Sequence, residues 1–170
     1  MDLRLTGQHV LITGGSRGIG LACAAEFLRE GTRVSIVGRN PEHLKNAQKQ
    51  LLQETGSTVA THRADLGDAE AALAVVEAAE RESGPVQVLV NSAGAARLTP
   101  FAELNPAAWQ AAMQAKFFSY INVTDPLIKR MGARGQGAVV NVIGMGGKVA
   151  TIHHKARQTH DLPGHCGSTE

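Results

Sequence analysis

The sequence is poor in cysteine and in aromatic residues. Its 170 residues include 2 cysteines, 1 tryptophan and 1 tyrosine. Cys23 and Cys166 lie far apart in the sequence, which argues against a disulfide framework and favours a reducing compartment. No apolar run is long enough to cross a membrane, and residues 1–4 do not begin a secretory signal. These absences predict a soluble cytoplasmic protein that does not insert into a membrane.

An excess of charge of one sign is also missing. The 17 lysines and arginines nearly balance the 15 aspartates and glutamates, and the net charge is +2. So small a charge does not indicate a nucleic-acid partner, and the basic residues between 126 and 160 have no aromatic residues among them. Four histidines lie near Cys166, but their spacing matches no standard set of metal ligands. The sequence therefore predicts neither a nucleic-acid-binding nor a metal-binding protein.

What the sequence does contain is an alternation of strands and helices. Apolar runs of strand length occur at residues 10–12, 34–37, 58–62, 86–90 and 138–143. A long helix is predicted from about Pro106, with Pro126 kinking or breaking it near Asp125. This order predicts an α/β fold, a doubly wound parallel sheet of the Rossmann type with about five strands, over residues 1–150. The periodicity stops after Ile152, so residues 151–170 are predicted to form an irregular or disordered tail.

The helical periodicity also predicts which side chains face the sheet. The sets assigned to buried faces are Ile19, Ala22, Cys23 and Phe27; Leu44, Ala47, Leu51 and Leu52; and Ala72, Val75, Val76 and Ala79. The stripe on the long helix comprises Trp109, Ala112, Met113, Phe117, Tyr120 and Ile121. A sheet that ends at the fifth strand leaves an edge open, with Val139, Val140 and Val142 on it. This edge predicts self-association, for example into a homo-oligomer, aggregation, or dependence on a partner.

A glycine-rich turn connects the first strand to the first helix. Gly14 allows a sharp turn, Gly18 lets the backbone approach a phosphate, and Gly20 lets the helix pack closely on the strand. Three residues separate Gly14 from Gly18, two more than separate the first two glycines of the common dinucleotide fingerprint, and a lone glycine pattern can also mark a plain turn. Because a strand precedes the turn and a helix follows it, we interpret it as a loop that binds the diphosphate of a dinucleotide.

The end of the second strand has no acidic residue. A carboxylate at this position commonly holds the ribose 2′-hydroxyl of NAD, but here the turn reads Gly38-Arg39-Asn40. Arg39, together with Arg17 of the glycine turn, suits a 2′-phosphate, because guanidinium groups form charge-assisted hydrogen bonds with phosphate oxygens. The sequence therefore favours NADP(H) over NAD(H). A solvated surface charge is the alternative for either arginine.

Two further segments end at the same edge of the predicted sheet. Asp65 and Leu66 follow the third strand, and residues 91–94 follow the fourth. Because the carboxyl ends of parallel strands share one edge, we expect a single ligand site there. Asp65 is either a loop acid of the capping type or a carboxylate near the adenine. Residues 91–94 are either a plain turn or a backbone that faces the ligand.

These segments together resemble the short-chain dehydrogenase/reductase family. The motifs are Thr-Gly-Gly-Ser-Arg-Gly-Ile-Gly at residues 13–20, Asp-Leu at 65–66 and Asn-Ser-Ala-Gly at 91–94, where the family has a second asparagine in place of the serine. The resemblance covers residues 5–150. It implies a nicotinamide cofactor and the oxidation or reduction of a carbonyl or alcohol carbon in a small-molecule substrate. It also implies that the cofactor is bound by Gly14, Ser16, Arg17, Gly18, Ile19, Gly20, Asp65, Leu66, Asn91, Ala93 and Gly94.

The catalytic half of the sequence departs from the family. Where the family has an asparagine and a serine, this sequence has Lys116 and Gly144, and residues 152–165 contain no tyrosine for the family's Tyr-x-x-x-Lys pair. In the family, that tyrosine supplies a proton and the serine polarises the carbonyl, so the absence of both is expected to lower the rate of turnover. Lys116 is a candidate surrogate proton donor, and a structural lysine packed along its stem is the alternative.

Two functions therefore stay open at the level of the sequence. The first is an NADP(H)-dependent oxidoreductase of the short-chain type. The second is a catalytically inactive nucleotide-binding remnant or a regulatory pseudoenzyme, in which a truncated or frame-altered C-terminus replaces the catalytic helix. An assay that finds cofactor binding without turnover would leave only the second. The sequence does not identify the substrate.

Overall fold

The structure is a computed structural model that describes residues 4–94 and 100–144. Its five strands form one parallel sheet in the order β3-β2-β1-β4-β5. The strands are β1 (His9–Thr13), β2 (Arg33–Gly38), β3 (Ala60–Arg63), β4 (Val86–Asn91) and β5 (Ala138–Asn141). The strand order reverses between β1 and β4, which makes this the predicted doubly wound fold.

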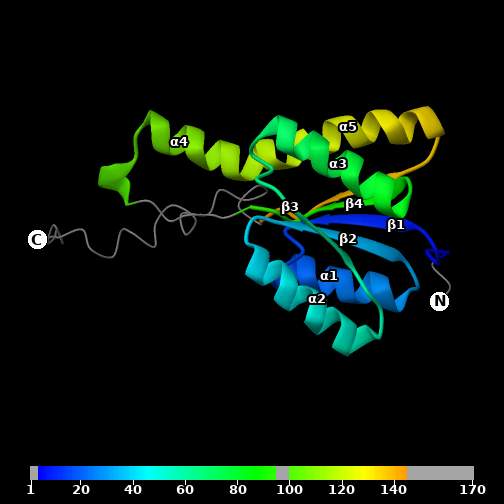
Figure 1. The fold of residues 1–170 in the computed structure, drawn as a ribbon. Coiled ribbons are helices and arrows are strands. Elements are labelled where there is room, and N and C mark those ends of the chain that lie inside the picture. Colours follow the sequence, from blue (N-terminus) through cyan, green and yellow to red (C-terminus); the bar gives the residue numbers. More distant parts are fainter. Residues whose placement is uncertain (1–3, 95–99, 145–170) are drawn as a thin grey trace, which may run out of the picture.

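Helices cover both faces of the sheet (Figure 1). Helices α1 (Gly18–Arg29) and α2 (Pro41–Thr55) lie on one face, and α3 (Ala69–Ser83) and α5 (Ser119–Arg134) lie on the other. A 3₁₀ turn η1 (Phe101–Glu103), helix α4 (Pro106–Met113) and a π-helical turn η2 (Gln114–Phe118) lead into α5. Helix α4 extends beyond the sheet, on the side where the strands end. In the part of the chain that the structure describes, no helix is long and apolar enough to cross a membrane.

Two apolar clusters lie on opposite faces of the sheet. Val10 and Ile12 of β1 join the cluster under α1 and α2, whereas Leu11 joins the cluster under α3 and α5. Side chains alternate between the faces of a strand, so a strand buried on both sides has an uninterrupted apolar sequence. This burial explains why β1 was readable as a continuous apolar run.

The predicted buried face of α1 is right at Cys23 and Phe27, which are partly buried against the cluster under α1 and α2, and wrong at its other two positions. Ile19 and Ala22 are exposed, and the residues that the helix buries are Gly20, Ala24, Ala25 and Leu28. A Cβ at position 20 would lie 2.5 Å from the carbonyl oxygen of Gly14. The helix therefore approaches β1 through its small residues, and assigning the face by its larger apolar side chains missed it.

Of the other predicted buried faces, that of α3 is confirmed, that of α2 is wrong at one position, and that of the long helix is largely wrong. Leu52 of α2 is exposed, whereas Leu44, Ala47 and Leu51 are buried as predicted. The α3 set Ala72, Val75, Val76 and Ala79 is buried throughout. The predicted stripe on the long helix is largely exposed. Trp109, Met113 and Phe117 are 48–54% accessible because α4 and η2 extend past the sheet, and Ile121 of α5 is 42% accessible.

The predicted break of the long helix near Asp125 is wrong, whereas the alternative of a kink at Pro126 stays a prediction. Helix α5 continues through Pro126 to Arg134. A proline inside a helix costs about 3 kcal/mol, but Val123, Leu127 and Met131 on the same helix are buried in the core. Burial of such side chains contributes about 1.5–3 kcal/mol each, which outweighs the proline penalty.

The sheet edge formed by β5 lies where it was predicted. Among the described residues β5 ends the sheet, and its ladder to β4 is extended by a hydrogen bond from Val142 N–H to the carbonyl of Asn91. Val140 is 49% exposed, whereas Val139 and Val142 are partly buried against the two clusters. Self-association through this edge stays a prediction, and the predicted tail of residues 151–170 lies outside the described residues.

Candidate functional site

A cavity of about 590 Å³ opens at the carboxyl ends of the strands. This is the size of a pocket for a small organic ligand. Its lining includes most of the residues that the sequence singled out, namely Gly14, Ser16, Arg17, Gly18, Ile19, Arg39, Asp65, Leu66, Ala93, Gly94 and Lys116. Gly20 and Asn91 do not line it, because Gly20 packs against the glycine turn and Asn91 lies below the rim.

The turn after β1 passes very close to the tip of β4. Gly14 has a φ of 68°, in the left-handed region, and a Cβ there would lie 2.8 Å from the Cα of Ala93. The buried Thr13 joins the two strands, since its hydroxyl accepts hydrogen bonds from the N–H groups of Ser92 and Ala93, each 3.1 Å long. These two N–H groups already have a hydrogen-bond partner in Thr13, so a ligand in the cavity would contact other atoms of residues 92–94.

The first helix begins without a side-chain cap. Helices α2, α3 and α4 are capped by Asn40, Asp68 and Asn105, whose side chains accept hydrogen bonds from the first helical N–H groups. Helix α1 has no such bond at Arg17 and no acidic residue in its first turn. Gly18, at the start of this helix, has open space where a Cβ would be. The N-terminus of α1 therefore offers unpaired N–H groups and a positive helix end to an anion.

Arg17 and Arg39 stand on the β2 side of the cavity. Both are exposed, and among the residues described neither forms an ion pair. Asn40 and His43 line the same end, and the sequence reasoning had assigned no binding role to either. The sequence could have indicated both residues, because they lie at the start of α2, directly after the carboxyl end of β2.

Asp65 fits both roles that the sequence left open. Its carboxylate accepts a hydrogen bond of 3.0 Å from the N–H of Gly67, which closes a tight turn, and the residue also lines the cavity. The cap of α3 is a different residue, Asp68. Leu66 is 5% exposed and is part of the core as well as the cavity wall.

Asn91 holds the sheet together below the cavity. It is fully buried, and its amide group donates to Thr124 and to Asn141, both at 2.9 Å. Its side chain thus connects β4, β5 and α5. The structure gives this asparagine a scaffold role, and its assignment to cofactor contact stays a prediction.

Lys116 enters the cavity from η2. Its stem packs on Gly94, where a Cβ would lie 2.6 Å from the lysine Cδ. Its ammonium donates a hydrogen bond of 3.1 Å to the hydroxyl of Tyr120, which in turn donates one of 2.8 Å to the carbonyl of Val142. Sequence reasoning placed Tyr120 only on an apolar stripe and missed this contact. Gly144, at the position of the family's serine, also lines the cavity.

The fold and the cavity together define a dinucleotide-binding protein of the Rossmann class. A family model described as "short chain dehydrogenase" matches residues 8–156. This chain belongs to the short-chain dehydrogenase/reductase family, as its sequence motifs had indicated.

Relatives of known activity cover most of this chain. Gluconate 5-dehydrogenase of Gluconobacter oxydans is 35% identical over 146 residues, which are 86% of this chain and 57% of the relative. D-threitol dehydrogenase of Mycolicibacterium smegmatis is 34% identical over 158 residues, 91% of this chain and 59% of the relative. The chain therefore spans little more than half the length of these relatives.

Solved structures with the same fold include NADPH complexes. The L-sorbose reductase of Gluconobacter frateurii, solved with NADPH and L-sorbose, is 32% identical with a TM-score of 0.76, over 83% of this chain and 54% of that one. An NADPH-bound short-chain oxidoreductase of Pseudomonas aeruginosa PAO1, described as containing an atypical catalytic center, is 31% identical with a TM-score of 0.79. Its match covers 91% of this chain and 63% of that chain.

Proposed function

We propose that this chain binds NADP(H) and belongs to an oxidoreductase that acts on a carbonyl or alcohol carbon of a small molecule. The residues present fit the cofactor: the glycine turn leaves room beside α1, the helix start has unpaired N–H groups, and the cavity extends across the β1–β4 reversal. A nicotinamide bound there would supply or accept a hydride. The expectation of a cytoplasmic location accompanies this proposal.

The pair of arginines at the β2 side carries the preference for the phosphorylated cofactor. Arg17 and Arg39 line the cavity without a partner among the described residues, so a 2′-phosphate would give them one. No carboxylate stands at the end of β2, where one would accept a ribose 2′-hydroxyl. Two structural relatives were solved with NADPH, which supports the same preference.

The test compares NADPH and NADH binding by fluorescence titration in the wild type and in Arg39→Ala. A lost charge-assisted hydrogen bond costs about 1.5–3 kcal/mol, so NADPH should bind about 10-fold more weakly or worse while NADH affinity changes little. Arg81→Ala is the matched control, because Arg81 is an exposed arginine of α3 outside the cavity. Equal NADPH affinity in Arg39→Ala and the wild type would remove the proposed phosphate contact.

A nucleotide-binding protein without turnover is the second candidate. Gly144 lines the cavity at the place of the family's serine and has no side chain to polarise a carbonyl. An NADPH-oxidation assay against a panel of ketoses and other ketones separates the two functions. Turnover of any member supports the oxidoreductase, and binding of NADPH without turnover across the panel supports the second candidate.

A further inference from the structure

We propose that Lys116 binds the reacting oxygen of the substrate and delivers a proton to it, with Tyr120 holding the ammonium in position. This inference rests on the proposed oxidoreductase function and assigns the acid of that reaction. Lys116 lines the cavity where the tips of β4 and β5 form its wall, and the glycine turn lies between this end and Arg39.

The π-helical turn places Lys116 in the cavity. Ala115, Lys116 and Ser119 all line the wall, and the widened turn η2 spans the first two of them. Single π-turns inside helices are frequent at functional sites. The helix is anchored to the loop after β3 by Gln114, which donates to the carbonyl of Gly67, and by Asn122, which donates to the carbonyls of Leu66 and Gly67. The lysine therefore projects from a fixed backbone.

The hydrogen bonds decide which group can give a proton to a ligand. The single hydroxyl proton of Tyr120 is directed to the carbonyl of Val142, so the phenol accepts from Lys116 and has no second proton to offer. The ammonium has three N–H donors, of which Tyr120 takes one. It also lies 4.9 Å from the centre of the Tyr120 ring, a cation–π distance. Lys116 thus keeps two donors for a ligand, and Tyr120 is a positioning residue.

The surroundings of the ammonium suit an oxygen that gains negative charge. Among the described residues at the β4–β5 end of the cavity, Lys116 carries the only charged side chain. When the carbonyl carbon accepts a hydride, the C=O π bond breaks and its electron pair moves to the oxygen. Lys116 Nζ donates its proton to that oxygen and becomes a neutral amine. A proton from the bulk solvent restores the ammonium, so reduction consumes one hydride and one proton. In alcohol oxidation the same transfers run in reverse.

A lysine with only a structural role would behave differently. Such a residue would stabilise the fold through its stem on Gly94, and replacing it would not change the affinity for an anion in the cavity. The two roles are separated by a measurement that needs no turnover.

The experiment measures binding of benzoate, a carboxylate that imitates the charged reacting oxygen, to protein saturated with NADP⁺, by calorimetry. The variants are Lys116→Met, which keeps an unbranched apolar stem, and Tyr120→Phe. Lys49→Met is the matched control, since Lys49 is an exposed lysine of α2 outside the cavity. NADP⁺ affinity and melting temperature are measured for each variant.

We expect Lys116→Met to weaken benzoate binding by about tenfold or more, the effect of one charge-assisted hydrogen bond. NADP⁺ affinity should stay at the wild-type level. Tyr120→Phe should give a smaller loss, and Lys49→Met none. Equal benzoate affinity in Lys116→Met and the wild type would overturn the proposal, as would a wild-type NADP⁺ complex that binds no benzoate. A wild type that fails to bind NADP⁺ at all would instead overturn the proposed function.

Discussion

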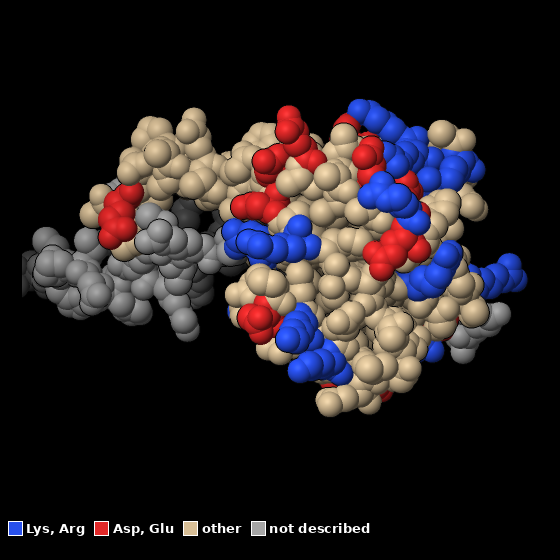
Figure 2. Space-filling view, viewed as in Figure 1, with Lys and Arg blue, Asp and Glu red and all other residues tan. Residues whose placement is uncertain are grey.

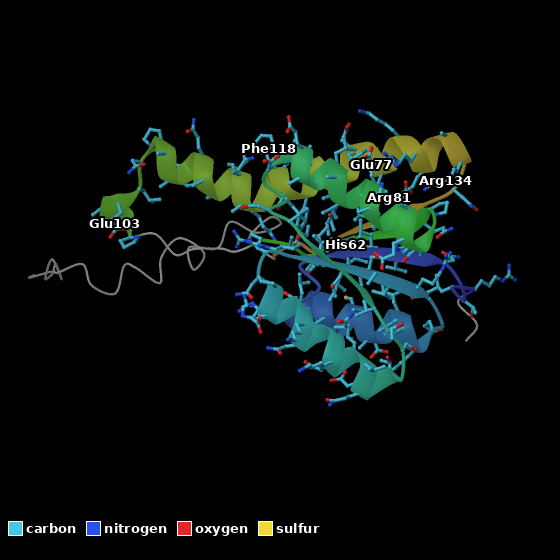
Figure 3. All side chains as sticks on the ribbon, viewed as in Figure 1. His62, Glu77, Arg81, Glu103, Phe118 and Arg134 are labelled. Atoms are coloured by element: carbon cyan, nitrogen blue, oxygen red, sulfur yellow. The ribbon has the colours of Figure 1, made fainter. Side chains whose placement is uncertain are left out.

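Glu80 should be a main source of stability at the end of the sheet away from the cavity. Its carboxylate accepts hydrogen bonds from the N–H of Val86 at 3.0 Å, from Arg130 at 2.7 Å and from Arg134 at 3.3 Å. Its side chain is only 13% exposed. Figure 2 shows acidic and basic side chains interspersed over this part of the surface, and Figure 3 shows Glu77 on α3 and Arg134 on α5, the two helices that Glu80 connects.

We predict that Glu80→Ala lowers the free energy of unfolding by about 3 kcal/mol. Hydrogen bonds to a charged group contribute about 1.5–3 kcal/mol each and do not add fully, and breaking a buried ion pair costs about 3–5 kcal/mol. The guanidinium groups are partly solvated, at 35% and 27% exposure, which favours the low end. For a protein of this size the melting temperature should fall by about 6–12 °C.

The matched control is Glu77→Ala. Glu77 is 50% exposed and, within the described ranges, its one ion pair is with Arg130 at 3.3 Å, so its loss should cost less than about 1 kcal/mol. Calorimetric melting of the wild type and both variants tests the difference. Equal losses in the two variants would refute the reasoning, because the effect would then come from charge on α3 rather than from the bonds to Val86 and Arg134.

The same carboxylate should make stability depend on pH. Burial alone would raise the pKa of Glu80, but the hydrogen bonds from Val86 and Arg130 and the charges of Arg130 and Arg134 lower it below its usual value of 4.5. A lowered pKa adds stability that is complete above pH 4.5 and is lost as the pH falls through the folded-state pKa. The difference in stability between the wild type and Glu80→Gln should therefore shrink below pH 4.5.

Two further predictions concern strand β1 and the glycine turn that follows it. Burial lowers the pKa of the His9 imidazole below 6.5, so the contribution of His9 to stability should be complete above pH 6.5 and should fall at lower pH. Melting temperatures of the wild type and His9→Gln, measured from pH 8 to 5.5, should depend less on pH in the variant. Identical slopes in the two proteins would contradict this. Gly14→Ala should weaken NADPH binding about tenfold or more and lower the melting temperature, because its Cβ meets backbone. Gly56→Ala, at a similar φ but in open space, should cost about 1–2 kcal/mol of stability and leave binding unchanged. Equal binding losses in the two glycine variants would contradict the close approach.

The end of the cavity at the glycine turn was largely predictable because backbone geometry restricts its residue types, and its binding of a cofactor stays a proposal. A turn with a left-handed residue that also touches the next strand requires glycine, and Gly14 satisfies both conditions. The position of Arg39 followed from the end of a buried strand, since the carboxyl ends of parallel strands share one edge. These features are local in sequence, so the order of strands and turns was enough to locate them.

The end of the cavity at Lys116 was less predictable because its contacts join residues that are distant in the sequence. Nothing near Tyr120 in the sequence indicates that its hydroxyl reaches Val142, 22 residues away on the sheet edge. The scaffold role of Asn91 likewise depends on Asn141, which becomes its neighbour only when β5 pairs with β4. Periodicity assigned Tyr120 to an apolar face, but a helix that widens by a π-turn changes the register of every later side chain.

That change of register has a consequence for how the cavity and the helix are coupled. Leu127 and Met131 fix the rotation of α5 against the core, and Gln114 fixes the start of the π-turn at the carbonyl of Gly67. Between these two anchors the direction of Lys116 is determined by the extra residue of the π-turn. An insertion or deletion within η2 would therefore rotate the lysine away from the cavity while leaving the buried face of α5 in place. Helix packing and the orientation of the candidate acid are thus set by different residues of the same helix, and each can be changed without the other.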